Sequence, residues 1–156
     1  MCDLLIPYTY TKYVWITSLF ILKNSYILFF NDEQVIGLLG FACYICTLLH
    51  WTKLKRQSMI KNIDMSICTC LYIYGLYRAS FYDCFLRYNF IACLSILAFL
   101  CNEYLNAKTH YKQDFDMQPI NYKKQVYYRS VLLHTIFLHI LQFENAGTVV
   151  VYCKRV

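Results

Sequence analysis

Long apolar runs separated by short polar segments dominate the pattern along this chain. An α-helix needs about 20 residues, at about 1.5 Å each, to cross the hydrocarbon core of a bilayer. Five runs come near that length, at residues 13–30, 35–52, 63–79, 88–105 and 125–143. The pattern therefore predicts an all-α fold, a multi-pass transmembrane helix bundle of about five spans, with residues 1–156 forming a single membrane domain.

The runs differ in how many polar groups interrupt them. The segment 35–51 contains no charged residue at all. Lys23-Asn24-Ser25 interrupts the first run, which is costly unless these groups face the bundle interior. The third run is short and is bounded by Asp64 and Arg78, so it requires tilted neighbours or a locally thinned bilayer.

Two polar segments bear on where the last span begins and ends. Residues 106–124 carry mixed charge and Pro119, and we expect a loop there rather than a separate domain. The sequence Glu-Asn-Ala-Gly at 144–147 is expected to break the fifth run. Residues 148–156 are then either a continuation of the same helix or a short re-entrant piece.

Composition favours a bilayer as the main partner. The chain is 59% hydrophobic and 15% charged, against about 45–50% and about 25% in an ordinary soluble domain. A small soluble domain has little interior in which to hide such an excess. The net charge of +6 does not indicate nucleic-acid binding, because the basic residues cluster in short loops beside apolar runs.

The distribution of basic residues predicts the orientation. Five spans would place the N-terminal tail, the loop after residue 52 and the 106–124 loop on one side of the membrane. The positive-inside rule puts the more basic side, and hence the N-terminus, in the cytosol. The cytosolic set has nine members, Lys12, Lys53, Lys55, Arg56, Lys61, Lys108, Lys112, Lys123 and Lys124, against four on the other side, Arg78, Arg87, Lys154 and Arg155.

Cysteine usage gives no strong metal motif. Most of the nine cysteines fall inside apolar runs, where a thiol behaves as a small hydrophobe. Cys43-Tyr-Ile-Cys46 is a single CxxC, and no second pair completes a zinc site. We expect these two cysteines to pack against neighbouring side chains.

Four ionisable side chains within or beside the apolar runs are the candidate site residues. Such groups are costly in a membrane and by default indicate function. His50 ends the second run, Asp64 opens the third, and His134 and His139 lie in the fifth. In the predicted orientation His50, Asp64 and His134 lie at one membrane level. Histidines that hold zinc beside a carboxylate are typical of hydrolases.

The spacing of the histidine pair leaves an alternative open. Residues five apart, such as His134 and His139, point roughly 140° apart on a regular helix. They share a face only if the helix contains a π-bulge. Otherwise the two histidines could hydrogen-bond across helices. Asp64 could simply cap the third span, because an acidic residue in the first turn of a helix interacts favourably with the helix dipole.

The same four residues resemble the motif of a known superfamily, the membrane hydrolases that include the alkaline ceramidases. The resemblance implies zinc held by His50, His134 and His139, with Asp64 as the catalytic carboxylate and a lipid amide as the substrate. The family serine falls here on Cys46, the histidine pair is one residue wider, and the family has seven helices. The resemblance thus implies a truncated or divergent relative, with or without catalytic activity.

Two functional hypotheses follow from these observations. The first is a small integral membrane protein with a structural or interaction role in the bilayer. The second is a divergent zinc-dependent lipid amide hydrolase. A channel or transporter has less support, because no paired inverted halves are visible.

Overall fold

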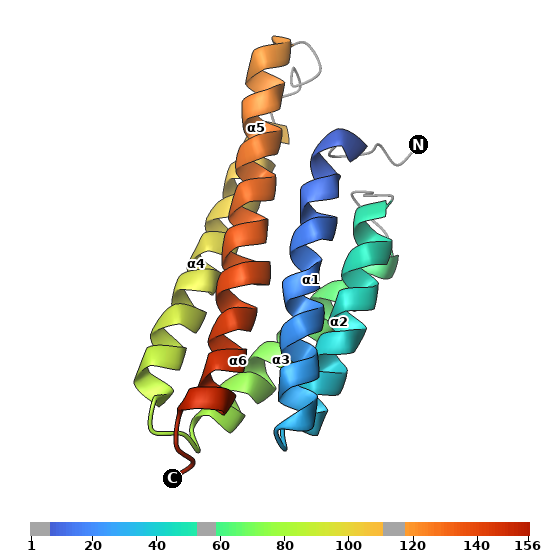
Figure 1. The fold of residues 1–156 in the computed structure, drawn as a ribbon. Helices are drawn as coiled ribbons and strands as arrows, with labels where there is room; N and C mark the ends of the chain where they lie inside the picture. The colour runs from blue at the N-terminus through green and yellow to red at the C-terminus, as the bar shows by residue number, and fades with distance from the viewer. Residues whose placement is uncertain (1–6, 53–58, 111–117) are drawn as a thin grey trace.

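The computed structural model describes residues 7–52, 59–110 and 118–156, and these form five helical rods with no strand among them. The last rod is continuous through three elements, because each begins where the previous one ends (Figure 1). The all-α prediction is confirmed. The elements are α1 (Tyr8–Phe30), α2 (Gln34–Thr52), α3 (Met59–Ala79), α4 (Phe85–His110), α5 (Ile120–Leu133), the π-helical η2 (His134–Leu141) and α6 (Gln142–Tyr152).

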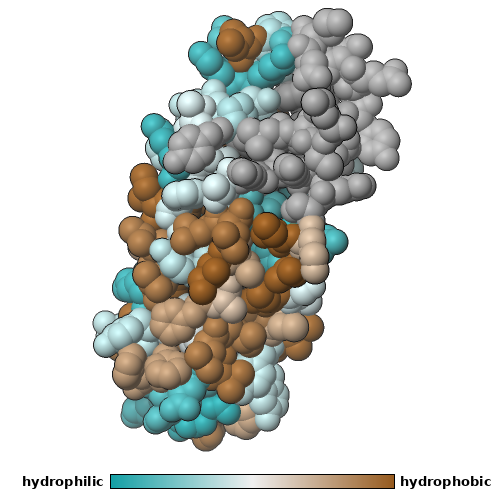
Figure 2. All heavy atoms as spheres, turned by 90° about the vertical axis from the view of Figure 1, so that its right-hand side faces the viewer, coloured by the Kyte–Doolittle hydropathy of each residue, from teal (hydrophilic) through white to brown (hydrophobic). Residues whose placement is uncertain are grey.

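Three of the described helices are long and apolar enough to cross a membrane, at Thr9–Phe30, Gln34–Thr52 and Phe85–Leu105. Many of their large apolar side chains are exposed on the outside of the bundle, among them Ile16, Leu38 and Leu97. Figure 2 shows hydrophobic side chains gathered over the middle of one face, with hydrophilic ones at its lower end. These features fit an integral membrane protein.

The rods alternate in direction along the bundle (Figure 1). Residues 31–33, residues 80–84 and the C-terminus therefore share one end, while the N-terminus lies at the other. The count of basic residues on the two sides assumed that successive loops lie at alternating ends of the bundle, as they do here. Lys53, Lys55, Arg56 and Lys112 lie outside the described residues.

The helices extend further than the apolar runs. The fourth run was expected to end at residue 105, but α4 continues to His110, and α5 begins at Ile120, inside the expected 106–124 loop. The expected break at 144–147 is absent, and α6 continues to Tyr152. The polar residues there are used between helices instead, since Glu144 accepts hydrogen bonds from Lys23 Nζ (2.6 Å) and Asn24 Nδ2 (3.1 Å).

Small polar side chains fill much of the interior. Asn24 and Ser25 are buried, as expected of polar groups within the first run, whereas Lys23 of the same segment is exposed. Buried hydroxyls satisfy themselves within their own helix, for example from Ser25 to Ile21 O (2.6 Å) and from Ser95 to Ile91 O (3.0 Å). Hydrogen bonding within the same helix suits a bilayer, because no water is present there to satisfy an unpaired donor. Helices in a bilayer associate through small residues and close packing.

A close approach between α1 and α2 gives the first testable prediction. A Cβ added at Gly37 would lie 2.7 Å from the backbone nitrogen of Phe29, so the α1 backbone would have to move. We expect Gly37→Ala to lower the free energy of unfolding by about 1–3 kcal/mol, as overpacking does. The measurement is SDS-induced unfolding in micelles, followed by tryptophan fluorescence.

Gly75→Ala is the matched control for Gly37→Ala. Its new Cβ would meet Tyr88 Oη at 2.7 Å, the end of a side chain rather than backbone. We therefore expect a smaller loss of stability than for Gly37→Ala. Equal losses would contradict the close backbone approach at Gly37.

Candidate metal centre

A π-helical turn brings the two histidines of the last rod together. Residues His134–Leu141 form η2, and this is the departure from regular α-helix that a five-residue spacing requires. His134 Nε2 and His139 Nε2 lie 3.1 Å apart, within hydrogen-bonding distance of each other in the absence of a metal. The condition for a shared face is met, and short π-helical segments occur frequently at functional sites.

His139 is oriented by a hydroxyl on the facing helix. Its Nδ1 lies 3.1 Å from Thr17 Oγ1 on α1. That hydroxyl donates its own hydrogen to the carbonyl of Tyr13 (2.9 Å) or Val14 (3.1 Å), so its lone pairs are free to accept from Nδ1–H. This tautomer leaves the Nε2 lone pair of His139 facing His134. Metal-binding histidines are commonly oriented in this way through their other ring nitrogen.

Asp64 faces the same region from α3. Its side chain is 7% exposed, and Thr47 Oγ1 donates to Asp64 Oδ1 over a long 3.5 Å. Thr47 belongs to α2, so this contact joins the two helices on either side of the basic loop. The second carboxylate oxygen accepts no hydrogen bond that the described residues record.

A cavity of about 250 Å³ unites Asp64, His134 and His139. Its polar lining also includes Ser95 and Gln142, and much of the remainder is apolar. Among the lining residues, Met65, Thr69, Ile73 and Ile96 are exposed on α3 and α4. Part of the cavity lining is therefore exposed at the surface of α3 and α4.

His50 is near this cavity but does not line it. It is buried at the end of α2, and its Nδ1 has no hydrogen-bond partner among the described residues. The Trp51 ring lies 5.7 Å from the His50 ring and 4.8 Å from the His134 ring, centre to centre. Within the described residues, the three histidines are not a group whose ligand atoms all lie within 4.8 Å of one another. His50 as a third ligand therefore stays a prediction.

Cys43 packs in a hydrophobic cluster with Ile21, Leu71 and Phe143, as expected, but the sequence did not predict that it meets a second cysteine in the cavity. Cys43 on α2 and Cys68 on α3 both line it, and their sulfurs lie 3.5 Å apart. The signal was present as two pairs with a four-residue spacing, Cys43 with Thr47 and Asp64 with Cys68, which each place two side chains on one helix face. Cys46, at the position of the family serine, is half-buried and does not line the cavity.

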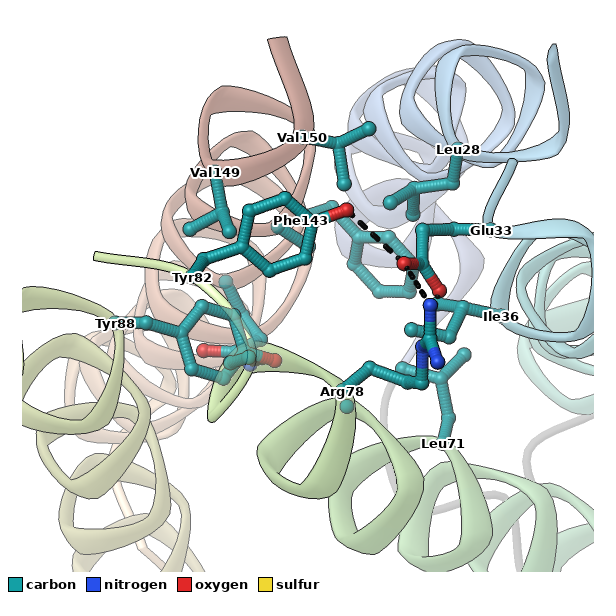
Figure 3. A pocket seen from close by; sticks show the side chains of 14 residues that line it. Leu28, Glu33, Ile36, Leu71, Arg78, Tyr82, Tyr88, Phe143, Val149 and Val150 are labelled. Carbon is teal, nitrogen blue, oxygen red and sulfur yellow. Dashed lines mark hydrogen bonds and ion pairs between the residues drawn. The ribbon is translucent and has the colours of Figure 1, made fainter. Parts of the chain in front are cut away.

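A second polar cluster lines a separate small pocket, near the end of the bundle that residues 31–33 and 80–84 share (Figure 3). Glu33, after α1, accepts two hydrogen bonds from Arg78, from Nε to Oε2 (2.7 Å) and from Nη2 to Oε1 (2.6 Å). Tyr82 Oη also donates to Glu33 Oε1 (3.0 Å). Burial raises the pKa of the Tyr82 hydroxyl, and the bond to Glu33 adds to this, so the tyrosine remains a donor at neutral pH.

The C-terminal tail is tied to the loop between α3 and α4 at that same end. A disulfide joins Cys84 to Cys153 across a sequence separation of 69. Asp83 N donates to Lys154 O (3.0 Å), and Val156 N donates to Phe81 O (2.8 Å). This pairing could not be predicted from the sequence, because neither cysteine belongs to a recognisable spacing.

No protein-family model, curated protein or solved structure matches this chain. The functional argument therefore rests on the cavity and its side chains.

Proposed function

We propose that this protein is a five-span integral membrane protein whose cavity holds zinc, and that it hydrolyses a lipid amide in the manner of the alkaline ceramidases it resembles. One observation carries the proposal. A π-helical turn places His134 Nε2 and His139 Nε2 3.1 Å apart in a cavity that Asp64 also lines.

The histidine geometry fits a zinc ion. Two ligand nitrogens at about 2.0–2.1 Å from a tetrahedral zinc lie about 3.3 Å from each other, close to the distance between the two imidazoles. His50 is proposed as the third ligand on the resemblance alone; its Nδ1 has no hydrogen-bond partner among the described residues, but the residue does not line the cavity. Bound zinc would polarise the substrate carbonyl and lower the pKa of a bound water to about 7.

The remaining roles belong to side chains of the cavity. Asp64 is placed to accept a proton from a water molecule there, with Thr47 holding one carboxylate oxygen. Thr17 holds His139 in the tautomer that binds metal through Nε2. The apolar part of the lining that is exposed on α3 and α4 is suited to acyl chains, because it would contact the hydrocarbon region.

The proposed orientation places the N-terminus in the cytosol. The count of basic residues favours it, and the Cys84–Cys153 disulfide gives a second, independent argument. Disulfides persist in oxidising compartments and are rare in the cytosol. The disulfide lies at the end shared by the C-terminus and residues 80–84, which the charge count assigns to the non-cytosolic side.

Metal analysis of the purified protein tests the proposal. We expect His134→Ala with His139→Ala to remove about one zinc per chain, as loss of a single catalytic site would. We also expect it to abolish hydrolysis of a ceramide in mixed micelles. His110→Ala, at the end of α4, is the matched control and should keep both zinc and activity.

The competing hypothesis is a structural or interaction role, and the absence of His50 from the cavity lining favours it. Under that hypothesis, folded protein is purified without zinc, and Asp64→Asn changes stability at most. Either result would contradict the hydrolase proposal.

A further inference from the structure

We propose that Cys43, Cys68 and Asp64 form a second metal site, which binds a borderline or soft divalent cation such as Zn²⁺ or Cd²⁺ between α2 and α3. This site uses no histidine of the proposed zinc centre, but it shares Asp64 with it, so Asp64 bound to a metal here would not be free to accept a proton there. The three potential ligand atoms of the site, two sulfurs and one carboxylate oxygen, all lie within 4.8 Å of one another.

The two sulfurs lie within thiol–thiol hydrogen-bond distance, so they form no disulfide, and their spacing is compatible with a shared ion. A disulfide requires about 2.05 Å between its sulfurs, whereas Cys43 Sγ and Cys68 Sγ lie 3.5 Å apart. Two thiolates bound at about 2.3 Å to one tetrahedral zinc lie about 3.8 Å apart. The sulfurs are thus already within a few tenths of an ångström of the spacing that a shared ion requires.

The surroundings leave room to complete the coordination. Cys43 is 3% exposed and Asp64 7% exposed, so both face inward rather than toward lipid. Thr47 occupies only one oxygen of Asp64. The cavity of about 250 Å³ that these residues line can supply water as a fourth ligand.

The donor set indicates which cations the site would take. Thiolates select zinc and softer ions, and they disfavour magnesium and calcium, which prefer oxygen ligands alone. Cys43 and Cys68 also pack in a hydrophobic cluster with Ile21, Leu71 and Phe143. The cysteines on the outer faces of the helices, Cys70, Cys93 and Cys101, are exposed.

Cobalt titration of the purified protein under reducing conditions tests the site. Thiolate ligands give cobalt a near-ultraviolet charge-transfer band that imidazole ligands do not give. We expect the band in the wild-type protein, and we expect Cys43→Ser with Cys68→Ser to remove it. Cys70→Ser with Cys93→Ser is the matched control and should retain it.

The histidine double variant separates this proposal from the proposed function. His134→Ala with His139→Ala should keep the cobalt–thiolate band even though it loses zinc from the histidine pair. A band that disappears with the histidines would show that the cysteines do not form a site of their own, which would overturn the proposal.

X-ray absorption on the zinc-loaded wild-type protein makes the test independent of how the variants fold. We expect sulfur scatterers at about 2.3 Å from zinc. Zinc surrounded by nitrogen and oxygen alone would overturn the proposal, as would the absence of a cobalt–thiolate band in the wild-type protein. A Cys43–Cys68 disulfide found by mass spectrometry in the reduced preparation would overturn it as well.

Discussion

Glu33→Gln is expected to lower the free energy of unfolding by about 1–3 kcal/mol, because it leaves the half-buried Arg78 guanidinium without its carboxylate partner. Glu33 is 3% exposed, and the Arg78 side chain is 18% exposed. The substitution keeps the shape of the side chain but leaves the guanidinium with no opposing charge. It also exchanges a carboxylate that accepts three hydrogen bonds for an amide with one acceptor oxygen.

Asp32→Asn is the matched control for Glu33→Gln. Asp32 is exposed and adjacent in sequence, and asparagine tolerates its positive φ of 65°. SDS-induced unfolding should therefore place this variant within about 0.5 kcal/mol of the wild type, as is usual for surface changes. Replacing both Glu33 and Arg78 with methionine should recover much of the loss, because a buried pair exchanged for apolar side chains is often neutral. Equal stability of Glu33→Gln and Asp32→Asn would contradict a stabilising role for the ion pair.

Cys84→Ser with Cys153→Ser is expected to be the second strongly destabilised variant. The disulfide closes a sequence separation of 69, for which loop-closure entropy predicts about 4 kcal/mol. The bilayer already restrains the unfolded helices, so we expect a loss of about 2–4 kcal/mol. Unfolding of the wild-type protein with and without reductant measures the same contribution without any substitution. Cys101→Ser, at an exposed thiol, should leave stability unchanged.

The disulfide also makes the orientation testable. We expect a glycosylation acceptor fused to the C-terminus to be modified in microsomes, and one fused to the N-terminus to remain unmodified. Both ends can be compared in one preparation. Modification of the N-terminal acceptor alone would reverse the orientation, and it would put the disulfide in the reducing compartment.

The sequence by itself determined the helical character of this protein and the apolar runs, three of which form described helices long and apolar enough to cross a membrane. Apolar runs of near-spanning length form helices because the bilayer forbids unsatisfied backbone groups, so run length alone predicts the elements. The antiparallel order of those runs then fixed which loops share an end. It also placed His50 at the end of α2, by the same loop that precedes Asp64 on α3.

The tertiary structure decided what could not be deduced from any single run. Where a helix ends depended on polar partners on other helices. The last rod continues past residues 144–147, where Glu144 accepts hydrogen bonds from Lys23 and Asn24 on α1. The π-helical turn at His134 is a local departure from 3.6 residues per turn. From the spacing of the histidines we could say only that such a turn is needed if they share a face, not that it forms. The pairing of Cys43 with Cys68 joins residues on different helices. Such pairings depend on how each helix is rotated about its own axis relative to its neighbours. Run length and hydropathy do not determine that rotation.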